Sequence, residues 1–136
     1  MTVKKIVLVG EDLCIRKEGI AGGSITPGHL VAGAPGGTIT ALASAASAVA
    51  KKQFAYEREM TGDGITVAYA ASDTVLYFTA PPGAVVYALT AAAVTAGDAL
   101  EASATAGALQ TRTTGRIIGY ALETVGSAGR CKIEVA

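Results

Sequence analysis

The sequence lacks most of the residue types from which active sites and metal centres are built. It has no tryptophan, one histidine (His29) and two cysteines (Cys14 and Cys131) that lie far apart in the chain. Neither cysteine stands in a C-x-x-C pair or close to the histidine, which excludes the usual zinc-site spacings. A G-x-S-x-G nucleophile motif and a P-loop are also missing. These absences predict a protein that is not an enzyme and that holds no metal or cofactor.

Charge is scarce and evenly balanced. Only 16% of the residues are charged, and eleven basic side chains cancel eleven acidic ones. This balance excludes the strongly basic surface on which non-specific nucleic-acid binding depends, so no nucleic-acid partner is expected. The mean hydropathy of +0.44 is high for a soluble monomer. We therefore expect the excess apolar surface to be covered by contacts between subunits.

Long hydrophobic runs are absent as well. The two longest uncharged stretches, residues 19–50 and 74–97, are broken by glycine and proline. A membrane-spanning helix needs about 20 uninterrupted apolar residues. The apolar run at residues 6–9 is too short for the core of a signal peptide. We expect a protein that is made in the cytoplasm and has no membrane partner.

The chain is long enough for one domain, but its core must be thin. Alanine supplies 28 of the 136 residues, whereas phenylalanine supplies 2 and leucine and isoleucine 9 each. Alanine buries little area, so small residues must pack closely. The two cysteines are expected to be reduced and buried, and a disulfide between them is the alternative.

Short β-rich segments separated by turn residues dominate the chain. The last one alternates most clearly, with Cys131, Ile133 and Val135 on one face and Lys132 and Glu134 on the other. Strands are expected at residues 3–9, from residue 30, and at 52–59, 67–69, 74–79, 85–89, 99–101, 116–125 and 130–135, with a further short extended piece at 13–16. Such spacing predicts a mainly β fold, a small β-barrel or sandwich.

Two segments are harder to interpret. Residues 19–24 are rich in glycine and are expected to be flexible. Residues 41–50 are rich in alanine, which favours a helix by propensity. They lack caps and a bulky apolar face, and an irregular strand or loop is the preferred interpretation.

An internal repeat indicates that the fold consists of two related β-units. The segment 26–31 (TPGHLV) resembles 95–100 (TAGDAL), and 71–75 (ASDTV) is a weaker third copy. Downstream, 54–57 (FAYE) matches 120–123 (YALE) at a similar separation. In each copy a tight turn leads into a strand. We expect the two units to fold against each other.

The candidate chemical residues all have simpler explanations. His29 is expected on the surface of a turn, and Gly62-Asp63-Gly64 is expected to form a hairpin loop rather than a phosphate cradle. Glu57 and Glu59 are two residues apart on one strand face, where paired carboxylates can do acid–base chemistry. Because basic residues flank them, they are expected to form a solvated strand face instead.

An ordered series of short runs covers nearly the whole chain: 25–31, 54–59, 63–65, 69–73, 75–78, 80–84, 86–89, 96–98, 100–101 and 118–123. This series, rather than one motif, resembles a family of small capsid cement (decoration) proteins of tailed phages. The resemblance implies a β-rich virion protein, commonly a homotrimer, on the outer surface of the expanded icosahedral head. It implies that the partner is the major capsid protein, whose neighbouring subunits the cement protein clamps together.

The N-terminal segment is the predicted interface. We expect residues 1–18 to form an extended arm and residues 19–136 to form a single β-rich domain. The arm residues that would contact the capsid or another copy are Val3, Lys4, Lys5, Ile6, Val7, Leu8 and Val9. Adding such an arm to the edge of a neighbour's sheet would satisfy backbone hydrogen bonds. The loops at residues 19–24 and 34–40 are expected to make further assembly contacts.

Two other functions are consistent with the sequence. One is a small β-barrel domain, either an enzyme or a ligand-binding module, with a pocket between the two repeats. The other is a structural component of a phage head fibre or tail.

Overall fold

The computed structural model describes residues 5–42, 51–58 and 64–136, and within these ranges it is a mainly β structure, as expected. The described elements are eleven strands and one short 3₁₀ helix: β1 (Val7–Val9), η1 (Glu11–Leu13), β2 (Ile15–Ala21), β3 (Val31–Ala32), β4 (Thr38–Ala41), β5 (Gln53–Ala55), β6 (Thr74–Thr79), β7 (Val85–Thr90), β8 (Ala99–Ala102), β9 (Leu109–Thr111), β10 (Gly119–Ala121) and β11 (Gly129–Val135). In these ranges, no helix has the length and apolar character needed to span a bilayer.

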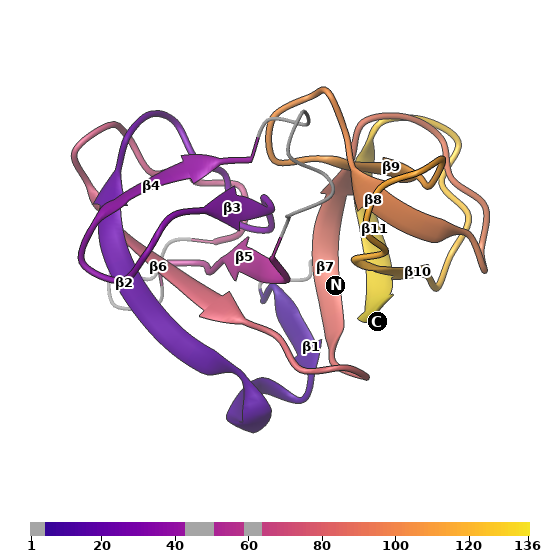
Figure 1. The fold of residues 1–136 in the computed structure, drawn as a ribbon, viewed down its shortest axis with the longest axis horizontal. Helices are drawn as coiled ribbons and strands as arrows, with labels where there is room; N and C mark the ends of the chain where they lie inside the picture. The colour runs from indigo at the N-terminus through magenta and orange to yellow at the C-terminus, as the bar shows by residue number, and fades with distance from the viewer. Residues whose placement is uncertain (1–4, 43–50, 59–63) are drawn as a thin grey trace.

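Strands β2 to β6 form a small barrel, the first barrel, which lies on the left in Figure 1. Strand β2 pairs antiparallel with β6 and parallel with β4, and β3 and β5 pair with β4 and β6 respectively. A bridge between Leu30 and Phe54 brings β3 beside β5. The Gly28 N–H donates to the Ala55 carbonyl, and the Ala55 N–H donates to the His29 carbonyl. These bonds close the sheet.

Strands β7 to β11 form the second barrel with the same connectivity. Strand β7 pairs antiparallel with β11 and parallel with β9, and β8 pairs with both β9 and β10. The cyclic order β7-β11-β10-β8-β9 reproduces the order β2-β6-β5-β3-β4 of the first barrel. Strand β1 is added beside β7, between the two barrels in Figure 1. The expectation of two related β-units is thus confirmed.

The repeated turn has the same chemistry in all three copies. In each copy, the side chain of the fourth residue accepts a hydrogen bond from the backbone N–H of the first: Thr26 to His29 (3.1 Å), Ala70 to Asp73 (2.8 Å) and Thr95 to Asp98 (2.9 Å). The third residue has a positive φ in every case, at Gly28 (93°), Ser72 (73°) and Gly97 (95°). A short acceptor at the fourth position and a left-handed third residue therefore define the turn.

The side chains of the first barrel divide between its interior and the space between the barrels. On β6, Val75 and Tyr77 point into the barrel, whereas Phe78 belongs to the larger core shared with the second barrel. The interior of the first barrel is small: Ala21, Ile25, Val31, Ile39, Ala55, Tyr69, Val75 and Tyr77. On β11, Cys131, Ile133 and Val135 are buried and the residues between them are exposed, which confirms the predicted alternation.

Three aromatic rings form the layer between the barrels. The rings of Phe54 and Phe78 stack with centroids 5.9 Å apart, and Tyr56 meets Phe78 edge-on at 5.0 Å. Backbone bonds support this layer, because Leu30 N–H donates to the Gly107 carbonyl and Gly107 N–H donates to the Leu42 carbonyl. The two barrels therefore share one continuous core.

Several segments differ from the sequence-based expectations. Residues 19–21, expected to be flexible, are the end of β2, because the absence of a side chain at Gly19 lets the strand pack against Ile39. A Cβ at Gly19 would lie 2.5 Å from the Ile39 Cγ1 atom. Of the strand expected at 116–125, only β10 is formed. The strand expected at 67–69 is not formed, and Tyr69 makes only an isolated bridge with Ile25. Strands β4 and β9 were not expected, and residues 43–50 of the alanine-rich segment lie outside the described residues.

The repeated turn allows a matched stability test. Replacing Gly97 by alanine introduces a left-handed alanine in open space, which costs about 1–2 kcal/mol. Replacing Gly28 by alanine adds a steric clash, because its Cβ would lie 2.8 Å from the Tyr87 carbonyl oxygen. We expect Gly28→Ala to lower the free energy of unfolding clearly more than Gly97→Ala. Urea unfolding measures both, and equal losses would contradict the tight packing described for Gly28.

Candidate interaction surface

The predicted interface segment is part of the protein's own sheet where the structure describes it. Val7 and Val9 pair with β7, and Ile6 and Val7 are buried in the shared core. The Ile6 N–H donates to the buried Glu57 carboxylate at 3.1 Å. Of the predicted interface residues, Lys5 and Val9 are exposed and Leu8 is half-buried, whereas Val3 and Lys4 lie outside the described residues. The expected arm boundary after residue 18 also falls within β2.

An exposed apolar corner lies where β1 turns through η1 into β2. Val9, Leu13 and Ile15 are 57%, 69% and 63% exposed, which is unusual for large aliphatic side chains that follow one another so closely. Glu11 lies within this corner and accepts from Arg16 at 2.9 Å and from Lys5 at 3.2 Å. We call Val9, Leu13 and Ile15 the apolar corner. Grouped exposed aliphatic residues of this kind are typical of contact surfaces.

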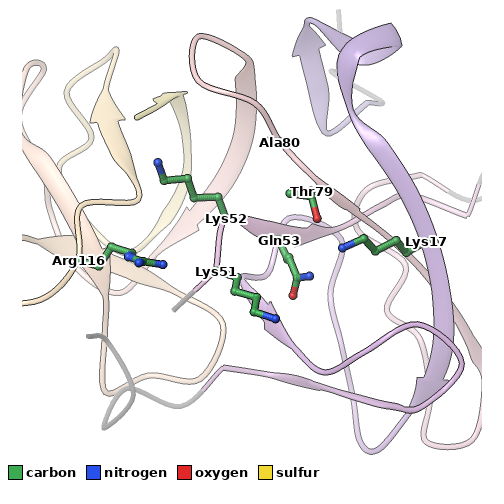
Figure 2. A pocket seen from close by; sticks show the side chains of 7 residues that line it. All are labelled: Lys17, Lys51, Lys52, Gln53, Thr79, Ala80 and Arg116. Atoms are coloured by element: carbon green, nitrogen blue, oxygen red, sulfur yellow. The ribbon is translucent and has the colours of Figure 1, made fainter. Parts of the chain in front are cut away.

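The open end of the first barrel is a cationic pocket of about 490 Å³. We call it the barrel mouth, and its lining residues are Lys17, Lys51, Lys52, Gln53, Thr79, Ala80 and Arg116. Figure 2 shows the Gln53 amide between Lys17 and Lys51, with Arg116 on the opposite side. Lys52 also donates a hydrogen bond to the backbone oxygen of Ala136. Four positive side chains from three segments thus line one opening.

The strand registers explain why these side chains gather there. Gln53 is opposite Thr79, and Thr79 is opposite Ile15, so the three side chains lie in one row across β5, β6 and β2. The next row on the same face contains Tyr77 and Lys17. Ile15 of the apolar corner is therefore next to Thr79, one of the residues that line the barrel mouth.

Two buried polar atoms of the lining residues have no hydrogen-bond partner among the described residues. They are the Gln53 Oε1 and Thr79 Oγ1 atoms. The Tyr77 hydroxyl, in the interior of the same barrel, also has none, and burial raises its pKa, which keeps it protonated. A buried polar atom without a partner costs about 1–3 kcal/mol, so these atoms are a local cost that the rest of the fold must offset.

The other sequence candidates have structural roles. His29 is in the turn, as expected, but it is half-buried against Gly107 rather than on the surface, and its Nδ1 atom accepts the Thr26 N–H. Burial lowers the pKa of His29, so the ring remains a neutral acceptor. Cys14 and Cys131 are both free thiols, and Cys131 is buried. The expectation for Glu57 was wrong, because it is buried against the Ile6 N–H rather than solvated.

Two further predictions, for Glu59 and for the loop at residues 62–64, fall on residues that the structure describes only in part or not at all. Glu59 is outside the described residues, as are Gly62 and Asp63 of the expected hairpin loop. In the described ranges, no cluster of three or more histidine, cysteine or acidic side chains has the arrangement to hold a metal ion.

Sequence reasoning missed Glu101 as the residue that organises the loop before Arg116. Its Oε1 atom accepts the backbone N–H groups of Thr113 (2.9 Å), Thr114 (3.2 Å) and Gly115 (2.8 Å). These bonds, above all the one from Gly115, lower the pKa of Glu101 to about 2. The buried carboxylate therefore fixes the loop that carries Arg116 to the barrel mouth. An acidic residue in a strand gave no signal of this role.

Comparisons with known proteins identify the fold. No protein-family model matches the chain, and no curated protein matches it. A solved structure described as the N base of the head fiber gp8.5 in bacteriophage phi29 is similar, with a TM-score of 0.63 and 13% sequence identity. The match covers 90% of this chain and 94% of that chain. At this identity the likeness shows a shared fold, which extends over both barrels.

The Glu101 carboxylate makes stability depend on pH. Its folded pKa of about 2 is below the ordinary value of 4.5, so its contribution is complete above about pH 4.5 and is lost as the pH falls toward 2. We expect Glu101→Gln to destabilise the protein by about 1–3 kcal/mol at pH 7. Its stability should also fall less steeply with acid than that of the wild type.

Thermal unfolding followed by circular dichroism between pH 7 and pH 2 measures both effects. Glu134→Gln, which changes an exposed carboxylate on β11, is the matched control and should follow the wild-type curve. Parallel acid curves for Glu101→Gln and wild type would contradict the assigned role of Glu101.

Proposed function

We propose that this protein is a structural protein of a tailed-phage head, and that it binds the outer surface of the expanded shell and clamps neighbouring major capsid subunits. The observation that carries this proposal is the double-barrel fold, which extends over nearly the whole of the phi29 head-fiber base. The ordered series of runs that resembles capsid cement proteins supports the same class. The proposed function is non-enzymatic, and the proposed location is the outside of the virion.

The apolar corner is the proposed contact with the shell or with another copy. Leu13 and Ile15 are the most exposed large aliphatic side chains among the described residues, and both are at one end of the molecule. The predicted interface at residues 3–9 is retained in a narrower form. Ile6 and Val7 support the core, whereas Lys5, Leu8 and Val9 remain available to a partner. A modest contact repeated over many copies on a shell binds tightly through avidity.

The proposed oligomer is a homotrimer, the state that the resemblance to capsid cement proteins implies. The high mean hydropathy and the exposed aliphatic residues at the apolar corner support association of copies, whatever their number. In a trimer, the three apolar corners would either pack against one another or all contact the shell. Native mass spectrometry measures the oligomer directly, and a monomer that still binds heads would restrict the proposal to contacts with the shell.

Co-sedimentation with expanded, undecorated heads tests the function. We expect saturable binding at a fixed ratio to the capsid subunit, and no binding to unexpanded shells. A Leu13→Ser substitution removes apolar area worth about 1.5–3 kcal/mol when fully buried, so binding should weaken about tenfold or more. A deletion of residues 2–10 is a poorer test, because Ile6 and Val7 belong to the core.

Leu122→Ser is the matched control for the corner variant. Leu122 is 46% exposed and follows β10 in the second barrel, away from the apolar corner. We expect this variant to bind heads as the wild type does. The proposal fails if folded wild-type protein does not sediment with expanded heads. The assignment of the corner fails if Leu13→Ser and Leu122→Ser have equal effects.

A second candidate is the base of a head fibre, which the similar solved structure favours by its own description. Both candidates are structural and both bind heads. A clamp between capsid subunits saturates in proportion to the capsid subunit, whereas a fibre base also binds a second virion protein. Copurification of such a protein from virions distinguishes them.

A further inference from the structure

The two barrels provide an internal comparison of the barrel mouth. Gln53 begins β5 and pairs with Thr79, the last residue of β6, just as Gly119 begins β10 and pairs with Val135, the last residue of β11. Tyr77 and Ile133 stand two residues before these strand ends. Tyr77 pairs with Lys17 on β2, just as Ile133 pairs with Val86 on β7. The matching positions are Gln53 and Gly119, Thr79 and Val135, Tyr77 and Ile133, and Lys17 and Val86.

The same end of the two barrels has opposite chemistry. In the second barrel, Val86, Ile133 and Val135 are buried in the shared core, and β1 pairs beside Val86. In the first barrel, the corresponding positions hold a lysine, a tyrosine and a threonine, together with the Gln53 amide, and the end is an open pocket. The second barrel thus shows that aliphatic side chains fill this position well.

The polar set in the first barrel is therefore not a requirement of the fold. Gln53 is only 2% exposed, yet its Oε1 atom has no partner among the described residues, and the same is true of the Tyr77 and Thr79 hydroxyl oxygens. Buried polar atoms are normally paired. Gln53 and Thr79 line the opening, where a bound group would complete their hydrogen bonds.

The charges around the opening define what that group is. Four of the seven lining residues are basic and none is acidic. The four cations come from β2, from the segment before β5 and from the loop before β10, and Figure 2 shows Arg116 and Lys17 on opposite sides. Positive charges spread around a rim match several carboxylates on one chain better than they match a single small anion. A peptide backbone N–H would also supply the donor that the Gln53 Oε1 atom lacks.

We propose that the barrel mouth binds an acidic peptide segment of a partner protein. Carboxylates of the segment bind Lys17, Lys51 and Arg116, and the peptide backbone hydrogen-bonds to the Gln53 amide. The exposed Ile15, next to Thr79, contacts an apolar residue of the same segment. This site goes beyond the proposed role on a phage head, because the chemistry of the pocket defines it whatever the partner.

The direct test is a titration of fluorescein-labelled hexaglutamate with the full-length protein, followed by fluorescence anisotropy. We expect saturable binding that weakens about tenfold in Lys17→Gln, the effect of losing one charge-assisted hydrogen bond. Lys132→Gln also removes one positive charge, but on the outer face of β11, and should leave the affinity within about twofold. Equal effects of the two variants, or no saturable binding by the wild type, would overturn the proposal.

A second variant tests the comparison between the barrels. The double substitution Lys17→Val and Thr79→Val copies the second barrel at two positions. We expect it to lose hexaglutamate binding and to melt at or above the wild-type temperature, because a buried unpaired hydroxyl is removed. A much lower melting temperature would show that the polar set is structural, and would contradict the proposal.

Competition experiments distinguish an acidic peptide from the other ligands that could bind the barrel mouth. Full displacement of hexaglutamate by an equal concentration of inorganic phosphate would show a small-anion site instead of a peptide site. Tighter binding of a single-stranded oligonucleotide, lost in the same Lys17→Gln variant, would replace the acidic peptide by a nucleic acid. The proposal predicts that neither probe competes as well as hexaglutamate.

Discussion

The packing of aromatic rings between the two barrels is the interaction on which the rest of the structure depends. The chain has only seven aromatic residues, and Phe54, Tyr56 and Phe78 meet in this single layer. Each barrel alone has an interior too small to bury much apolar area. Joining them produces one continuous core, and it also fixes where the loop of the second barrel carries Arg116. The barrel mouth therefore exists only because the two barrels are held together.

Duplication of one barrel allows its two copies to differ. The second barrel is closed by aliphatic residues and carries β1. The first barrel keeps polar and charged residues at its corresponding end, next to the apolar corner. In the proposed role, the first barrel supplies the contact surface, whereas the core shared by both barrels supplies the stability of the fold.

The sequence allowed the fold class to be predicted because its signals are local. Turns such as Thr26 to His29 and the alternation along residues 130–135 depend on near neighbours, and both were confirmed. Strand β4 and the end of β2 were not expected, because their strand character depends on the close packing of Gly19 against Ile39 across the barrel. The barrel mouth was also beyond sequence reasoning. Lys17, Gln53 and Arg116 are distant in the chain and meet only through strand register and the loop that Glu101 organises.

The orientation of the protein on the head is best measured by a cryo-electron microscopy reconstruction of expanded heads saturated with it. We expect each copy to face the shell with the apolar corner and the barrel mouth, while the second barrel points away from it. An acidic segment of a shell protein would then be visible at Lys17 and Arg116. A reconstruction in which the second barrel contacts the shell and the barrel mouth faces solvent would contradict the proposed mode of binding.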